Sequence, residues 1–207
     1  MYPSRKSKFI FQFLSWYITY IIKKDFSSYS YDELRLKEDK AILLLANHFS
    51  WWDGFLMFHL NKVVFKKEFH VLVTKEDYQR QRYLKYLGAF ASEPKGKDVF
   101  ETLTYAGQLL DDPKNLVLLF PQGRLYSSYV NNISFEKEVM HLINASKKKF
   151  QMVFSATLTN CFGKRKPKMK SYLCTWEAEE YISLQLLKRE YNKHYTEAVH
   201  KQIKKSA

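Results

Sequence analysis

The sequence predicts a single α/β domain built on a largely parallel β-sheet that is flanked by helices. Three observations carry this prediction. Short apolar runs, typical of strands buried on both faces, alternate with segments whose apolar residues recur at helical spacing. The 207 residues are 46% hydrophobic and 27% charged, a balance that excludes disordered and low-complexity proteins. Only 6 glycines and 5 prolines are present, too few for a turn-rich β-sandwich.

The chain begins with an apolar segment that we expect to form a helix. Residues 9–22 are mostly apolar and aromatic, with lysines on both sides. A membrane-spanning helix needs roughly 20 apolar residues, so this segment is too short to cross a bilayer. It could lie in the membrane interface or pack on the protein's own core, and its aromatic residues and flanking lysines favour the interface. We therefore divide the chain into a membrane-associating helix, residues 1–26, and an α/β domain, residues 27–207.

Strands and helices alternate after a polar link at residues 27–40. The apolar runs predict strands at residues 41–46, 69–74, 115–120, 151–157 and 171–176. Helical spacing predicts helices at residues 50–60, 75–87, 99–110 and 135–146, and a long C-terminal helix at residues 181–205. Strands that alternate with helices are typical of a parallel sheet.

The positive charge is concentrated at the two ends of the chain. Of the formal net charge of +13, residues 1–24 carry +5 and residues 161–207 carry +6. Such ends favour a polyanionic partner, either an anionic lipid surface or nucleic acid. The apolar N-terminal segment favours the lipid surface. The basic run at residues 163–170, in a chain with 17% aromatic residues, leaves a nucleic-acid-binding module as an alternative, although nucleic acid is not the expected partner.

Candidate catalytic residues follow the first predicted strand. Asn47 and His48 leave residues 41–46, and Asp53 lies in the first turn of the next helix. Asp53 can reach back to accept a hydrogen bond from His48 Nδ1, which would leave Nε2 free to take a proton from a substrate hydroxyl. The alternative is structural, because Ser50 and Asp53 also have the spacing of a capping box at a helix start.

A second segment follows the strand at residues 115–120. Pro121 and Gly123 predict a tight turn with exposed backbone N–H groups, and Arg124 adds a fixed cation with a planar donor fork. This combination suits a phosphate or a carboxylate. Its alternative is an ordinary turn with a solvated arginine.

In this order, the two segments resemble the glycerolipid acyltransferase family, which includes the 1-acylglycerol-3-phosphate acyltransferases. That family is marked by an Asn-His-x4-Asp block and a Phe-Pro-Glu-Gly-Thr-Arg block. Asn47, His48 and Asp53 match the first block, and residues 120–123 resemble the second about 70 residues further on. Lys75 is similar to a lysine that the family places near the acceptor phosphate. The resemblance covers roughly residues 40–160.

The resemblance implies an O-acyltransferase of phospholipid biosynthesis. It would move a fatty acyl group from an acyl thioester, acyl-CoA or acyl-ACP, to the hydroxyl of 1-acylglycerol-3-phosphate or a related lyso-lipid. His48 would be the general base, oriented by Asp53 and supported by Asn47. The acceptor-binding residues would be Lys75, Gln122, Gly123 and Arg124. We expect no metal and no cofactor beyond the acyl thioester, and a peripheral or monotopic location on an anionic membrane surface at its cytoplasmic face.

The departures from the family pattern concern acceptor binding more than chemistry. Gln122 stands where the family has Glu, and Arg124 and Leu125 replace Thr-Arg. Two alternatives therefore stay open. One is the same chemistry on a non-phosphate acceptor such as an acylated amino acid, and the other is a catalytically inactive relative that binds lipids.

Overall fold

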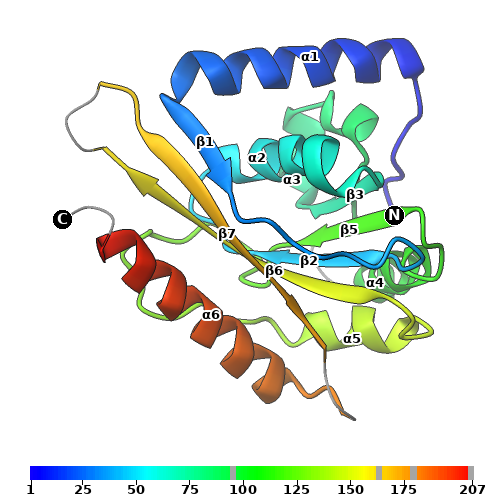
Figure 1. Ribbon diagram of the computed structural model, residues 1–207. Helices are drawn as coiled ribbons and strands as arrows, with labels where there is room; N and C mark the ends of the chain where they lie inside the picture. Colours follow the sequence, from blue (N-terminus) through cyan, green and yellow to red (C-terminus); the bar gives the residue numbers. More distant parts are fainter. Residues whose placement is uncertain (94–96, 162–164, 178–180, 205–207) are drawn as a thin grey trace.

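The computed structural model describes residues 1–93, 97–161, 165–177 and 181–204 (Figure 1). The strands are β1 (Ser28–Tyr31), β2 (Ile42–Ala46), β3 (Glu68–Val73), β4 (Ala89–Ala91), β5 (Asn115–Leu119), β6 (Gln151–Asn160) and β7 (Lys168–Trp176). The helices are α1 (Lys8–Asp25), α2 (Trp52–Leu60), α3 (Lys75–Arg80), α4 (Lys97–Leu109), α5 (Glu138–Ala145) and α6 (Leu184–Lys204). A π-helical turn η1 (Asn61–Phe65) continues α2, and a 3-10 turn η2 (Leu84–Leu87) precedes β4.

The described strands form one seven-stranded sheet in the order β1-β7-β6-β2-β5-β3-β4. β7 runs antiparallel to β6, and every other pair of neighbours in this order is parallel. The predicted fold class, a single α/β domain with a largely parallel sheet, flanking helices and a long C-terminal helix, is confirmed.

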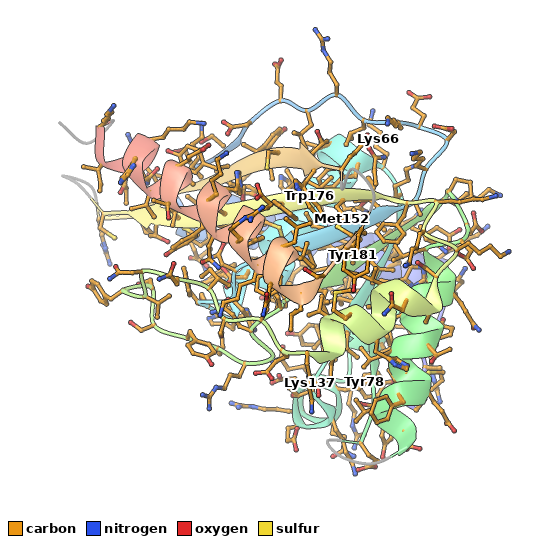
Figure 2. The ribbon with its side chains drawn as sticks, turned by 90° about the horizontal axis from the view of Figure 1, so that it is seen from below. Lys66, Tyr78, Lys137, Met152, Trp176 and Tyr181 are labelled. Atoms are coloured by element: carbon orange, nitrogen blue, oxygen red, sulfur yellow. The ribbon has the colours of Figure 1, made fainter. Side chains whose placement is uncertain are left out.

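The sheet separates two hydrophobic cores because side chains alternate along each strand. In β2, Leu43 and Leu45 point into a core that they share with α4, α5 and α6. Leu44, the residue between them, points into the opposite core, which is closed by α1 and α2. Figure 1 shows α1 and α2 on one side of the sheet and α5 and α6 on the other. Figure 2, from below, shows α6 crossing the sheet near Met152 and Trp176, which pair across β6 and β7.

Helix α1 packs on the domain with one face and exposes aromatic side chains on another. Ile18 and Ile22 are buried in the core that α1 shares with α2. Phe9, Phe13 and Trp16 are 83%, 56% and 61% exposed. The helix therefore combines core packing with an exposed aromatic face. Among the described residues, no helix has the length and apolar character needed to cross a membrane.

Three local predictions are wrong or incomplete. The link at residues 27–40 contains β1, whose mostly exposed Ser-Tyr-Ser-Tyr sequence lacks an apolar run and which pairs with β7. The predicted helix at residues 75–87 is interrupted after α3, because α3 buries no side chain and Gln81 leaves helical geometry. The short strand β4 was not predicted from its three residues. The last residue of the predicted C-terminal helix, Lys205, lies outside the described residues.

Gly88 provides a test of this packing. Its φ is +90°, and a Cβ built there would lie 1.8 Å from the carbonyl oxygen of Phe69. We expect Gly88→Ala to lower the free energy of unfolding by about 2–4 kcal/mol, measured by urea denaturation. Gly54→Ala is the matched control, because a Cβ at Gly54 meets nothing within 4 Å and alanine favours a helix. Equal stability of the two variants would contradict the expectation.

Candidate active site

The predicted site segments meet at one edge of the sheet. β2 and β5 are parallel neighbours with Leu45 opposite Leu119, so the loops that leave their carboxyl ends begin side by side. β3 is the next parallel neighbour of β5, and Lys75 follows its end. The carboxyl edge of a parallel sheet is where α/β proteins bind their ligands. The fold thus brings together residues that lie about 70 positions apart in the sequence.

His48 and Asp53 are in contact. Asp53 Oδ2 lies 3.2 Å from His48 Nδ1 and also accepts hydrogen bonds from the backbone N–H groups of Phe49 and Ser50, at 2.7 and 2.8 Å. The Asp53 side chain is buried, whereas that of His48 is 21% exposed. Asp53 therefore satisfies the backbone donors at the start of α2, as the structural alternative expected, and its carboxylate also contacts the imidazole.

The loop between β5 and α5, residues 120–137 (the β5 loop), also contacts His48. The ring of Phe120 stacks on the His48 imidazole, with 4.1 Å between centroids and 16° between planes. Gln122 Oε1 accepts a 2.6 Å hydrogen bond from the His48 backbone N–H, and the His48 carbonyl accepts one from the Tyr126 N–H at 3.0 Å. These two backbone contacts between the loops were not predicted.

Asn47 anchors the same loop to β6. Its Nδ2 donates to the Thr157 carbonyl at 3.0 Å, and its Oδ1 accepts from the Thr157 N–H at 2.7 Å. Asn47 is fully buried. Tyr191 of α6 donates a hydrogen bond to the carbonyl of Ser155, in the same strand as Thr157. Burial raises the pKa of Tyr191 well above its usual value. Asn47, predicted as a supporting residue, thus binds both backbone groups of Thr157, an arrangement we call the Asn47 clamp.

His48 lines a cleft of about 690 Å³. Its walls come from α2, β3, α3, η2, β4, α4, the loop between β5 and α5, and the start of α5. Large apolar side chains dominate the part nearest α2 and β3, including Trp51, Phe55, Phe58, Phe69, Val71 and Leu84. Trp51 is 54% exposed. The cleft has the size and apolar lining of a pocket for an extended apolar ligand.

The two predicted cations also line this cleft, but both have partners. Lys75 Nζ lies 2.6 Å from Glu93 Oε1, and this hydrogen bond raises the pKa of Lys75 and lowers that of Glu93. Arg124 lies over the ring of Tyr126 at 5.0 Å. Four acidic residues line the cleft as well: Glu76, Asp77, Glu136 and Glu138.

The predicted tight turn is present after β5. The Gly123 N–H donates to the Phe120 carbonyl at 3.1 Å, and Gly123 has a φ of +68°. A Cβ there would lie 3.0 Å from Cγ of Glu136. Glycine therefore fits this position for two reasons, its positive φ and the close approach of Glu136.

Helix α6 supports the wall of the cleft, a function that the sequence did not suggest. Asn192 Oδ1 accepts from the Ile133 N–H at 2.6 Å and its Nδ2 donates to the Ile133 carbonyl at 3.0 Å, while Tyr195 donates to the Val130 carbonyl. These contacts fix the middle of the loop between Gly123 and α5. A helical stripe in the sequence predicts burial but does not indicate which backbone groups it binds.

We expect Asn192→Ala to lower the free energy of unfolding by about 1–3 kcal/mol, because both backbone groups of the fully buried Ile133 lose their partner. Urea denaturation measures the change. Asn131→Ala, at an exposed position of the same loop, is the control and should stay within about 0.5 kcal/mol of wild type. A loss of similar size in both variants would contradict this role of Asn192.

The remaining predictions concern metals and nucleic acid. Across the described residues, no group of three or more His, Cys, Asp or Glu side chains could hold a metal ion. Gly163 and Lys164 of the basic run lie outside the described residues, whereas Arg165 and Lys166 are described and exposed.

Comparison with known proteins agrees with the geometry. The family model Acyltransferase matches residues 29–158, from β1 through most of β6, and leaves α1 and α6 outside the match. No curated protein matches the chain. The matched region contains both site loops and covers more than half of the chain. The chain therefore belongs to the glycerolipid acyltransferase family, and the predicted enzyme class, acyltransferase, is confirmed.

Proposed function

We propose that this acyltransferase moves a fatty acyl group from an acyl thioester, acyl-CoA or acyl-ACP, to the hydroxyl of a mono-acylated lipid. One observation carries the proposal: His48, in contact with the buried Asp53, lines a large, mostly apolar cleft. A base in such a cleft can meet both an acyl chain and an acceptor hydroxyl. The family match supports the general reaction, and the site supports this form of it.

In the proposed mechanism His48 acts as a general base. Asp53 accepts the Nδ1–H of His48, so that Nε2 is the nitrogen that removes the proton of the acceptor hydroxyl. The acceptor oxygen attacks the thioester carbonyl carbon and forms a C–O bond. The C–S bond then breaks, and the leaving thiolate takes the proton from His48. The products are the acylated lipid and a free thiol, and no metal or further cofactor takes part.

The first candidate acceptor is 1-acylglycerol-3-phosphate or a related lyso-lipid. The second candidate is a lipid without a phosphate, and the charges of the cleft favour it. Lys75, proposed to bind the acceptor anion, is paired with Glu93. Among the described residues, the cleft also contains four carboxylates and, besides Lys75, one other cation, Arg124, so the acidic side chains outnumber the basic ones and disfavour a phosphate dianion. An uncharged head group avoids this repulsion, and the single carboxylate of an acylated amino acid reduces it relative to a phosphate dianion.

The experiment that tests the reaction uses purified protein, labelled acyl-CoA and acyl-ACP, and a panel of acceptors. The panel contains lysophosphatidate, monoacylglycerol and an N-acylated serine. We expect a labelled diacyl product that requires both thioester and acceptor. The absence of product with every pair, from folded protein, would leave the inactive lipid-binding alternative.

We further propose that the protein works on an anionic membrane at its cytoplasmic face, as a peripheral or monotopic protein. Helix α1 supports this, because its exposed aromatic face lies near five basic residues of the N-terminal segment. Helix α1 also contacts the wall of the cleft. The ring centroid of Phe11 in α1 lies 5.6 Å from that of Phe58, which lines the cleft.

Removing two aromatic side chains of α1 tests the membrane contact. We expect Phe13→Ala with Trp16→Ala to weaken binding to anionic vesicles by about 10-fold or more, since each large side chain loses its burial in the interface. Vesicle co-sedimentation measures the change. Tyr129→Ala is the control, because Tyr129 lies in the loop between β5 and α5 and is 94% exposed. Unchanged binding of the double variant would refute the contact.

A further inference from the structure

A buried hydrogen-bond donor without a partner lies beside the base. Gln122 is fully buried and lines the same cleft as His48. Its Oε1 accepts the His48 backbone N–H at 2.6 Å. Within the part of the chain that the structure describes, its Nε2 has no hydrogen-bond partner. Native proteins rarely leave such a group unpaired, so this donor points to a ligand.

The orientation of the Gln122 amide is fixed by the chemistry of its partner. A backbone N–H can only donate, and the nitrogen of a carboxamide cannot accept. The oxygen must therefore face His48, which leaves the NH₂ group on the other side of the amide. If the Gln122 amide were flipped, its NH₂ group would face the His48 backbone N–H, and both groups are donors. The unpaired group is thus a donor and requires an oxygen from the ligand.

The charges around the cleft indicate which kind of oxygen fits. Gln122 is neutral, Lys75 is paired with Glu93, and Glu136 lies against the neighbouring Gly123. Arg124, the other cation among the described residues of the cleft, lies over the ring of Tyr126. An anionic oxygen at Gln122 Nε2 would be buried against a neutral amide and not against a cation, which is costly. An uncharged carbonyl oxygen needs only one donor and fits a neutral amide.

We propose that Gln122 Nε2 donates to the carbonyl oxygen that joins the existing acyl chain to the acceptor. This inference rests on the proposed function, because it assigns a group on the acyl acceptor. In a mono-acylated lipid this carbonyl is an uncharged acceptor oxygen a few bonds from the hydroxyl that His48 serves. Gln122 would therefore distinguish an acceptor with an ester or amide linkage from one with an ether or amine linkage, independently of its head group.

The test pairs each acceptor with an analogue that lacks the carbonyl oxygen. The pairs are monoacylglycerol with monoalkylglycerol, and lysophosphatidate with its 1-alkyl ether. N-acylserine is left out, because N-alkylserine would add a cationic amine besides losing the oxygen. We expect the wild type to prefer the carbonyl member by about 10-fold in kcat/KM, mostly through the KM of the acceptor. The preference should appear with every head group that reacts.

Two variants then separate the donor from the support of His48. Gln122→Glu keeps an oxygen for the His48 N–H but loses the donor, and Gln122→Met loses both. We expect both to reduce the carbonyl preference to within about twofold, since neither offers an N–H to the substrate. Gln108→Glu, at an exposed position on α4, controls for the added charge. Thermal unfolding of each variant verifies that it is folded.

The outcomes are distinct. A wild type without the preference overturns the inference. So does a fall in kcat that is equal for both members of a pair while the carbonyl preference is retained, which would place Gln122 on the reacting thioester or on His48 alone. If the wild type is inactive, binding of the same pairs is measured instead by intrinsic tryptophan fluorescence, to which Trp51 at the cleft contributes. Tighter binding of the carbonyl member that is lost in the variants would then support the inference while the proposed function fails. Binding of neither member, with no transfer, overturns both.

Discussion

Replacing His48 by alanine is expected to lower kcat for acyl transfer about 10²- to 10⁴-fold, the usual contribution of a general base. Only the imidazole is removed. The backbone of His48 keeps its bonds to Gln122 and Tyr126, so the loop stays in place. The lost stack on Phe120 should cost about 0.5–1.5 kcal/mol of stability, which leaves the protein folded.

The measurement is steady-state acyl transfer beside thermal unfolding of the same preparation. His200→Ala is the matched control, because His200 is exposed on α6, away from the cleft. It should retain wild-type kcat. A His48→Ala variant with near-normal kcat would exclude His48 as the base and would assign proton transfer to another group.

Asp53→Ala is expected to lower kcat by about 10²- to 10⁴-fold as well, and in addition to destabilise the fold by about 2–4 kcal/mol. The reason is that one buried oxygen, Oδ2, accepts the N–H groups of Phe49 and Ser50 and contacts His48. Its removal leaves the backbone donors at the start of α2 without their acceptor and leaves the imidazole without its carboxylate.

Asp53→Asn distinguishes the two roles of this carboxylate. The side-chain oxygen of asparagine can accept the N–H groups of Phe49 and Ser50 as the carboxylate does, so a purely structural Asp53 predicts normal kcat and nearly normal stability in this variant. If the carboxylate stabilises the protonated imidazole, kcat falls by about 10-fold or more although the protein remains folded. Asp39→Asn, on the exposed surface, controls for the loss of one negative charge. Comparing kcat and thermal unfolding of the two asparagine variants decides between these interpretations.

The sequence was sufficient to predict a strand where every residue of that strand is buried. β2 and β5 are buried at every position, and their uninterrupted apolar runs identified them. Their predicted ends lie within one residue of the observed ones, and the structure places the loops of His48 and Gln122 at the same edge of the sheet. By contrast, β1 is mostly exposed and β4 has only three residues, so neither produces a pattern that propensity or periodicity can detect.

In the candidate site, the contact between the His48 and Asp53 side chains was predictable from the sequence, but the backbone contacts were not. The spacing of His48 and Asp53 indicated their contact, because both belong to one loop and helix start. The bonds of Gln122 to the His48 N–H and of Asn192 to Ile133 join residues 74 and 59 positions apart. A backbone group is the same at every residue, so no residue type indicates which one a distant amide will bind.

The Asn47 clamp has a consequence for how the chain leaves the sheet. The side-chain amide of Asn47 presents to Thr157 a donor and an acceptor, as a peptide group would, so the ladder between β2 and β6 gains one more rung made by a side chain. Backbone pairing between β2 and β6 therefore ends at Ala46, while the Asn47 side chain makes the next contact with β6. The peptide groups on either side of the His48 Cα are free to bind Gln122 and Tyr126 instead. The side chain of one residue continues the sheet, while the backbone of the next joins the two loops of the site.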